Sequence, residues 1–257
     1  MALKKNLRIC QKPLRIDVRN PPMRKGVDII KINILHFIEG ARKARGVAVI
    51  IDVFRAFSFE CYAIHNNAKR IIPIASKDLA YELKQKTPDY LLAGERKGVM
   101  PPGFDYGNSP TQIEHVDLSD KVIVHTTSAG TQGLANARSA HEILTGSLVN
   151  AKATAAYIKK RHFGQVSLVC MGNEGVRPAA EDELCAEYMK ALLEDRSMDL
   201  SEQIENLKTA GGERFFDSLR SDVFPERDFY LCTALNKFDF VLKFDYDTDG
   251  LGYITKK

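Results

Sequence analysis

The sequence has 257 residues, of which 44% are apolar and 27% charged, so it has the composition of a globular protein that can bury a substantial core. Its most apolar run, Gly46–Val53, is far shorter than the roughly 20 residues that cross a bilayer, and the basic stretch Met1–Arg8 leads into no apolar signal sequence, so we expect a cytoplasmic protein without a membrane span. The five cysteines form no C-x-x-C pair, which argues against a zinc ribbon, and the net charge of +4 is not gathered into a basic stripe, which argues against nucleic-acid binding.

After a polar N-terminal arm, short β-branched or apolar runs alternate with helix-like stretches, the pattern of crossover units around a parallel sheet. The predicted strands are 47–53, 70–75, 90–93, 121–126, 142–145, 165–171 and 240–244. The predicted helices are 58–67, 77–86, 130–138, 151–161, 181–194 and 201–208. This order predicts an α/β fold with a largely parallel or mixed sheet flanked by helices. We expect one compact unit over residues 1–257, with two α/β halves as the alternative if a seam lies near residue 140.

Polar residues follow several of these strands. In open parallel sheets, ligands bind beyond the carboxyl ends of the strands, so these positions are candidates for one shared pocket. The polar strand ends are Asp52 and Arg55, Gly94–Gly98, Thr126–Thr131, Gly146–Ser147 and Gly172–Gly175.

Asp52 stands within an otherwise apolar run, where an unpaired charge is costly. A metal ion or an arginine partner would compensate it, and Arg55 is close enough in sequence to pair with it or to reach an anionic ligand. The alternative is that Asp52 caps a helix and that Arg55 has no functional role.

The loop from Gly94 to Pro110 reads GERKGVMPPGFDYGNSP, and its glycines and prolines preclude a regular element. So long a loop in a compact domain is usually functional or disordered, and its two aromatic residues favour anchoring on the core. Arg96 and Lys97 are candidate anion ligands, and Glu95 is a candidate acid, base or metal ligand. The alternative is a solvated surface loop.

The Thr126–Thr131 turn could cradle a phosphate with backbone N–H groups at a helix start, although hydroxyl residues there also serve ordinary capping. Glu181 and Asp182 open a predicted helix, where the dipole favours acids whatever the function. They could equally supply oxygen ligands for Mg²⁺. Two further patterns, 170–177 and 245–250, lack the spacing of a cysteine-phosphatase loop and of an EF-hand, and we discount both.

Taken together, the motifs resemble those of the 2-phosphosulfolactate phosphatase family, the ComB-like proteins of coenzyme M biosynthesis. The resemblance covers about residues 47–239, and GFDYGNSP is its most specific motif. The matching segments are IDVFRA at 51–56, GERKG at 94–98, GFDYGNSP at 103–110, TTSAGTQGL at 126–134, TGSLVNA at 145–151 and the 172–175 turn before Glu181 and Asp182.

The resemblance implies a Mg²⁺-dependent phosphoric monoester hydrolase with a ComB-like α/β fold, acting on a small polyanionic phosphorylated acid. The substrate would be 2-phosphosulfolactate, which carries phosphate, carboxylate and sulfonate groups. A phosphatase for another small phosphorylated acid and a non-catalytic phosphoester-binding module are the alternatives. Oligomeric state stays open, with a homodimer as one option.

The candidate residues follow from these motifs. The catalytic candidates are Asp52, Arg55, Glu95, Arg96 and Asp105. The substrate-binding candidates are Lys97, Asn108, Ser109, Thr126, Thr127, Ser128, Gly130, Thr131, Ser147, Asn150, Asn173 and Glu174. The metal-ligand candidates are Asp52, Glu181 and Asp182.

In the expected mechanism, Asp52 with Glu181 or Asp182 holds Mg²⁺, and Arg55 and Arg96 stabilise the transferring phosphoryl group. Glu95 or Asp105 is the base, and an Asp52 phosphoenzyme is a second route. If Arg96 faces the ligand, its replacement by alanine cripples turnover without unfolding the protein.

Overall fold

The structure, a computed structural model, describes residues 30–257. The polar arm and the basic Met1–Arg8 stretch of the sequence analysis lie outside the described residues. The strands are β1 (Lys31–His36), β2 (Val47–Ile51), β3 (Arg70–Pro73), β4 (Leu91–Gly94), β5 (Val122–Thr126), β6 (Glu142–Gly146), β7 (Gln165–Cys170), β8 (Leu242–Tyr246) and β9 (Gly252–Lys256). The α-helices are α1 (Phe37–Lys43), α2 (Ala56–His65), α3 (Lys77–Lys86), α4 (Pro110–Ile113), α5 (Gly130–Asn136), α6 (Ala151–Lys160), α7 (Ala180–Leu193), α8 (Ser201–Asn206) and α9 (Glu226–Thr233).

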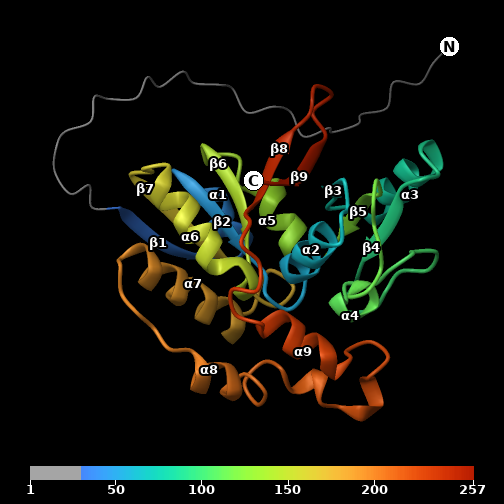
Figure 1. Cartoon of the computed structure of the whole chain (residues 1–257). Coiled ribbons are helices and arrows are strands. Elements are labelled where there is room, and N and C mark those ends of the chain that lie inside the picture. The colour runs from blue at the N-terminus through green and yellow to red at the C-terminus, as the bar shows by residue number, and fades with distance from the viewer. Residues whose placement is uncertain (1–29) are drawn as a thin grey trace.

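These strands form one sheet in the order β1-β7-β2-β6-β8-β9-β3-β5-β4. The first four strands run parallel to one another, and so do the last three. The antiparallel β8–β9 hairpin stands between the two parallel groups, as Figure 1 shows, and pairs with β6 on one side and with β3 on the other. The predicted α/β class with a mixed, largely parallel sheet is confirmed.

Strand β2 shows why the sheet is buried on both faces. Val47, Val49 and Ile51 pack in one cluster with residues of α6 and α7, while Ala48 and Ile50 pack in another with residues of α1, α2 and α5. Successive side chains of a strand point to opposite faces, so an unbroken apolar run fits a strand covered by helices on both sides. Figure 1 shows α6 and α7 together over the β1-β7-β2-β6 group.

The predicted elements are present, with bounds that differ by a few residues. Helix α3 begins and ends where predicted, because Ser76 caps it by accepting a hydrogen bond from the Leu79 N–H at 3.5 Å and lysines occupy its last turn. The elements not predicted are β1, β9, α1, α4 and α9. Strand β9 was missed because its turn resembled half an EF-hand, whereas Asp247 closes that turn by accepting hydrogen bonds from the N–H groups of Asp249 and Leu251.

Among residues 30–257, no helix combines the length and the apolar character that crossing a membrane requires.

Candidate active site

A pocket of about 260 Å³ lies where the segments that follow β2, β4, β5 and β7 meet the stretch between α8 and α9. Several residues selected from the sequence line it: Asp52, Arg55, Glu95, Lys97, Asn108, Ser128, Asn173 and Glu174. Others line it without having been selected: Phe54, Gly98, Ala129, Gly172, Arg177, Arg214, Arg220 and Phe224. The selected residues outside this lining are Arg96, Asp105, Ser109, Thr126, Thr127, Gly130, Thr131, Ser147, Asn150, Glu181 and Asp182.

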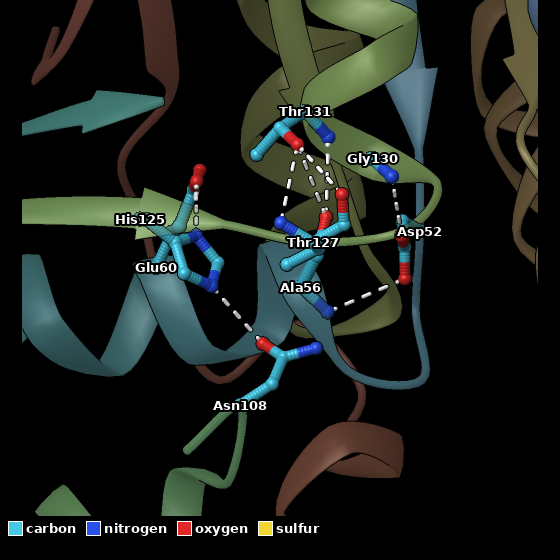
Figure 2. Close-up of polar contacts among 8 residues, drawn as sticks. All are labelled: Asp52, Ala56, Glu60, Asn108, His125, Thr127, Gly130 and Thr131. Atoms are coloured by element: carbon cyan, nitrogen blue, oxygen red, sulfur yellow. Dashed lines mark hydrogen bonds and ion pairs between the residues drawn. The ribbon is translucent and has the colours of Figure 1, made fainter. Parts of the chain in front are cut away.

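Asp52 and Glu95, which we call the carboxylate pair, are held by backbone N–H groups. Asp52 accepts from the N–H groups of Gly130 at 2.9 Å and of Ala56 at 3.3 Å (Figure 2). It therefore binds the backbone at the start of α2, and it also lines the pocket. Glu95 accepts from the N–H groups of Ser128 and Gly98, both at 2.7 Å. The turn that was expected to cradle a phosphate therefore directs two of its N–H groups at the protein's own carboxylates.

Burial, together with the nearby negative charge of Glu95, raises the pKa of Asp52 from 3.8 to about 6, although the N–H groups of Ala56 and Gly130 lower it. Both side chains are 8% exposed, so solvent screens their repulsion poorly. Two buried carboxylates that repel each other and line one pocket form a site whose repulsion a bound cation would relieve.

Arg55 lines the pocket but has a fixed partner. Its guanidinium donates to Asp228 at 2.6 Å and to the Val223 carbonyl at 2.8 Å, and it lies 4.8 Å from the centre of the Phe224 ring. The second oxygen of Asp228 accepts from Ser109 and Thr111, so one buried carboxylate joins Arg55 to the loop after β4. Ser109 is thus a structural contact in this geometry and not a ligand of the pocket.

Arg96 and Asp105 lie behind the site, which corrects the expectation that they face the ligand. The guanidinium of Arg96 donates to the carbonyls of Glu95 and Ala75 and to the hydroxyl of Thr126, which ties together the ends of three strands. Asp105 accepts from the Leu92 N–H at 2.7 Å at the sheet edge. Both side chains are thus engaged with backbone or hydroxyl groups of the fold and not with the pocket.

The buried hydroxyls of Thr127 and Thr131 also differ from the expectation. They bond to each other's backbone, with the Thr131 hydroxyl donating to the Thr127 carbonyl at 3.0 Å, so they fix the turn between β5 and α5 (Figure 2). Ser147 shares a hydrogen bond with the hydroxyl of Ser58 at 2.7 Å, and Asn150 accepts from the Ser147 N–H. These four residues therefore hold the turns that follow β5 and β6 in place.

The metal-ligand candidates Asp52, Glu181 and Asp182 do not form a compact set. Both oxygens of Asp182 accept backbone N–H groups at 2.8 Å, from Val53 and from Gly172, so this carboxylate clips the end of β2 to the end of β7. Within the described part of the chain, three potential ligand atoms gather only at His36, Cys170 and Glu183.

Glu181 is 2% exposed and lies 3.6 Å from the guanidinium of Arg214. Burial raises its pKa to about 7, although the positive charge of Arg214 opposes the shift. Glu181 does not line the pocket itself, but its contact with Arg214 positions an arginine that does.

Three arginines that the sequence analysis did not select line the pocket: Arg177, Arg214 and Arg220, which we call the arginine cluster. Arg214 and Arg220 lie 5.6 and 4.7 Å from the Phe224 ring, and Arg214 donates to Asn173 at 3.4 Å. Phe224 reaches them because Gly98, with a positive φ of 82°, leaves room where a Cβ atom would come within 2.5 Å of its ring. The sequence did contain a signal for two of these arginines, since the segment 211–220 combines two arginines with two glycines and two phenylalanines.

Comparison with known proteins adds a family assignment to this geometry. A family model described as 2-phosphosulpholactate phosphatase matches residues 33–246. A protein of Bacillus subtilis named probable 2-phosphosulfolactate phosphatase is 35% identical over 205 residues, covering 78% of this chain and 88% of that protein. Proteins with the same name from Carboxydothermus hydrogenoformans and Thermoplasma acidophilum are 38% and 36% identical, covering 68% and 61% of this chain and 72% and 69% of theirs.

Proposed function

This chain belongs to the 2-phosphosulfolactate phosphatase family, and we propose that it hydrolyses 2-phosphosulfolactate to sulfolactate and inorganic phosphate. The observation that carries the proposal is the pairing of two carboxylates with several cations in one pocket. Lys97, Arg177, Arg214 and Arg220 offer positive charge to a ligand with three acidic groups, and the carboxylate pair offers groups that can act on a phosphoryl centre.

The residues of the carboxylate pair fit a divalent metal ion, which we propose to be Mg²⁺. Mg²⁺ is usually bound by one or two carboxylates together with substrate phosphate oxygens and water. Asp52 and Glu95 supply hard oxygens, and each oxygen of Asp52 accepts one N–H group in the structure, which leaves further lone pairs. Bound there, Mg²⁺ would neutralise charge on the phosphoryl oxygens and lower the pKa of a water.

The chain's own residues would orient the substrate. The exposed Lys97 and the arginine cluster bind its acidic groups, and Arg55 presents a guanidinium that its buried ion pair with Asp228 holds in place. Asp52, with its pKa near 6, is ionised at neutral pH. It therefore acts either as the nucleophile at phosphorus or as the group that orients and deprotonates the attacking water.

Phosphate release tests the function. The chain is incubated with 2-phosphosulfolactate and with a panel of other phosphorylated hydroxy acids, each with Mg²⁺ or with EDTA. We expect the highest kcat/KM for 2-phosphosulfolactate and a loss of turnover in EDTA that Mg²⁺ restores. No release from 2-phosphosulfolactate would contradict the substrate, and full activity in EDTA would contradict the metal.

Rapid-quench trapping with labelled substrate separates the two roles of Asp52. A phosphoenzyme sensitive to hydroxylamine, absent in Asp52→Asn, would establish the nucleophile. Direct transfer of the phosphoryl group to water leaves no label on the protein.

A further inference from the structure

A buried chain of three polar residues reaches the pocket from the protein interior. His125 of β5 contacts Glu60 of α2 through Nδ1, at 2.9 Å from Oε1, and contacts Asn108 through Nε2, at 3.1 Å from Oδ1 (Figure 2). Glu60 and His125 are fully buried, and Asn108 is 6% exposed and lines the pocket. Neither Glu60 nor His125 lines the pocket, so Asn108 is the residue of this chain that can contact a ligand.

The protons on Glu60 and His125 determine whether the amide oxygen or the amide nitrogen of Asn108 faces His125. A buried carboxylate beside a neutral imidazole would leave an uncompensated charge, and burial raises the pKa of Glu60. The electroneutral alternatives are a protonated Glu60 beside a neutral His125 and an ionised Glu60 beside an imidazolium. When Glu60 donates its proton to Nδ1 in the first form, or accepts one from Nδ1 in the second, Nε2 carries a proton and donates to the Asn108 oxygen, which is the orientation that the structure has, at 3.1 Å.

The Asn108 amide nitrogen is then the group left for the pocket. Within the described residues, this nitrogen makes no hydrogen bond and is not among the enclosed polar atoms that lack a partner. It therefore remains open to a ligand. An NH2 group supplies two donors for anionic oxygens, whereas the opposite orientation would present an oxygen and repel them.

We propose that Asn108 donates hydrogen bonds to an anionic oxygen of the substrate and that the Glu60–His125 pair is the positioning device that fixes this orientation. The proposal rests on the proposed function in that the ligand is a phosphoester. It adds a neutral donor, the Asn108 amide, whose orientation is set by the proton on His125 Nε2. Because it neither adds charge nor pairs with the carboxylate pair, this donor can contact the phosphoryl group without disturbing Asp52.

Phosphate binding by Asn108 variants tests the donor. Inorganic phosphate is titrated into the full-length protein by calorimetry, without turnover. Asn108→Asp should weaken binding about 10- to 100-fold and Asn108→Ala about 10-fold, because a donor to a charged ligand is lost. Asn136→Asp, the same change outside the pocket lining, is the control and should leave the Kd unchanged.

Two substitutions of His125 test the positioning. Glutamine places an amide near the location of Nε2 and keeps a donor toward Asn108, whereas asparagine reaches only the location of Nδ1. We expect His125→Asn to weaken phosphate binding as Asn108→Ala does, and His125→Gln to restore the Kd to within about 3-fold of the wild type. A merely structural role predicts equal effects on binding from both.

Wild-type affinity in Asn108→Asp, or no phosphate binding by the wild type, would overturn the donor assignment. Equal Kd values for the two His125 variants would overturn the positioning role. If the His125 variants do not fold, the two Asn108 variants decide. A Kd for phosphate that is higher in Asn108→Asp than in Asn108→Ala shows that the group facing the ligand is a donor. Failure to turn over 2-phosphosulfolactate would refute the proposed substrate and leave these binding results standing.

Discussion

The carboxylate pair and the arginine cluster line the same pocket but are built from different kinds of backbone. Asp52 and Glu95 directly follow parallel strands, are 8% exposed and accept hydrogen bonds from fixed N–H groups. Arg177 lies in the turn after β7 and Arg220 ends a short 3-10 helix, Ser218–Arg220, and both are exposed. This difference suits the roles proposed above, in which the carboxylate pair acts on the phosphoryl group and must be held rigidly, whereas the arginine cluster recognises the other acidic groups and can adjust.

Removing the charge of Asp52 should have the largest effect. We expect Asp52→Asn to lower kcat by about 10³-fold or more, because in the proposed mechanism this residue reacts with the phosphoryl group or activates the water. Steady-state kinetics measure this loss, and phosphate titration shows whether the pocket is intact. Turnover within about 10-fold of the wild type would remove Asp52 from the chemistry.

The same substitution should stabilise the protein, and the gain should depend on pH. The pKa of Asp52 is raised from 3.8 to about 6, so its ionisation disfavours the folded state and stability from this group is lost as the pH rises through 6. In EDTA at pH 8, Asp52→Asn should unfold with a free energy higher by at most about 3 kcal/mol, and the gain should vanish near pH 4. Urea unfolding at both pH values checks this, and a loss of stability at pH 8 would contradict the strain assigned to the pair.

Breaking the arginine cluster should affect specificity more than chemistry. We expect Arg220→Ala to lower kcat/KM for 2-phosphosulfolactate about 10- to 100-fold, but to affect 2-phospholactate, which lacks the sulfonate, far less. Lys208→Ala removes a cation outside the pocket lining and serves as the control. Equal losses on both substrates would place Arg220 at the phosphate instead.

Arg96 provides the smallest and most discriminating test. Because its guanidinium ties strand ends together, Arg96→Ala should lower the free energy of unfolding by about 1–2 kcal/mol and reduce kcat only through displacement of Glu95. The expectation drawn from sequence was that this substitution cripples turnover without unfolding the protein, because Arg96 was expected to face the ligand. Thermal unfolding and steady-state kinetics measure the two effects. Loss of turnover with an unchanged free energy of unfolding would indicate that Arg96 contacts the ligand.

Local patterns predicted much of the fold because they act over a few residues. The alternation of apolar runs with capped helical stretches predicted both ends of α3 correctly and located most of the strands. The elements that were missed, such as α4 and β9, are short or stabilised by distant partners. Helix α4 has four residues, and its first turn is held by Asp228, 117 residues away in the chain.

The sequence by itself determined the α/β class, the family and the strand ends at which polar residues gather, because strand and helix periods and motifs are local properties of the chain. Only the tertiary structure decided which of those residues face the pocket. Arg96 and Lys97 are neighbours with similar charge, yet one lies behind the site and the other lines it. The arginine cluster and the Glu60–His125–Asn108 chain join segments far apart in sequence, and such contacts are set by packing and by the pairing of buried charges.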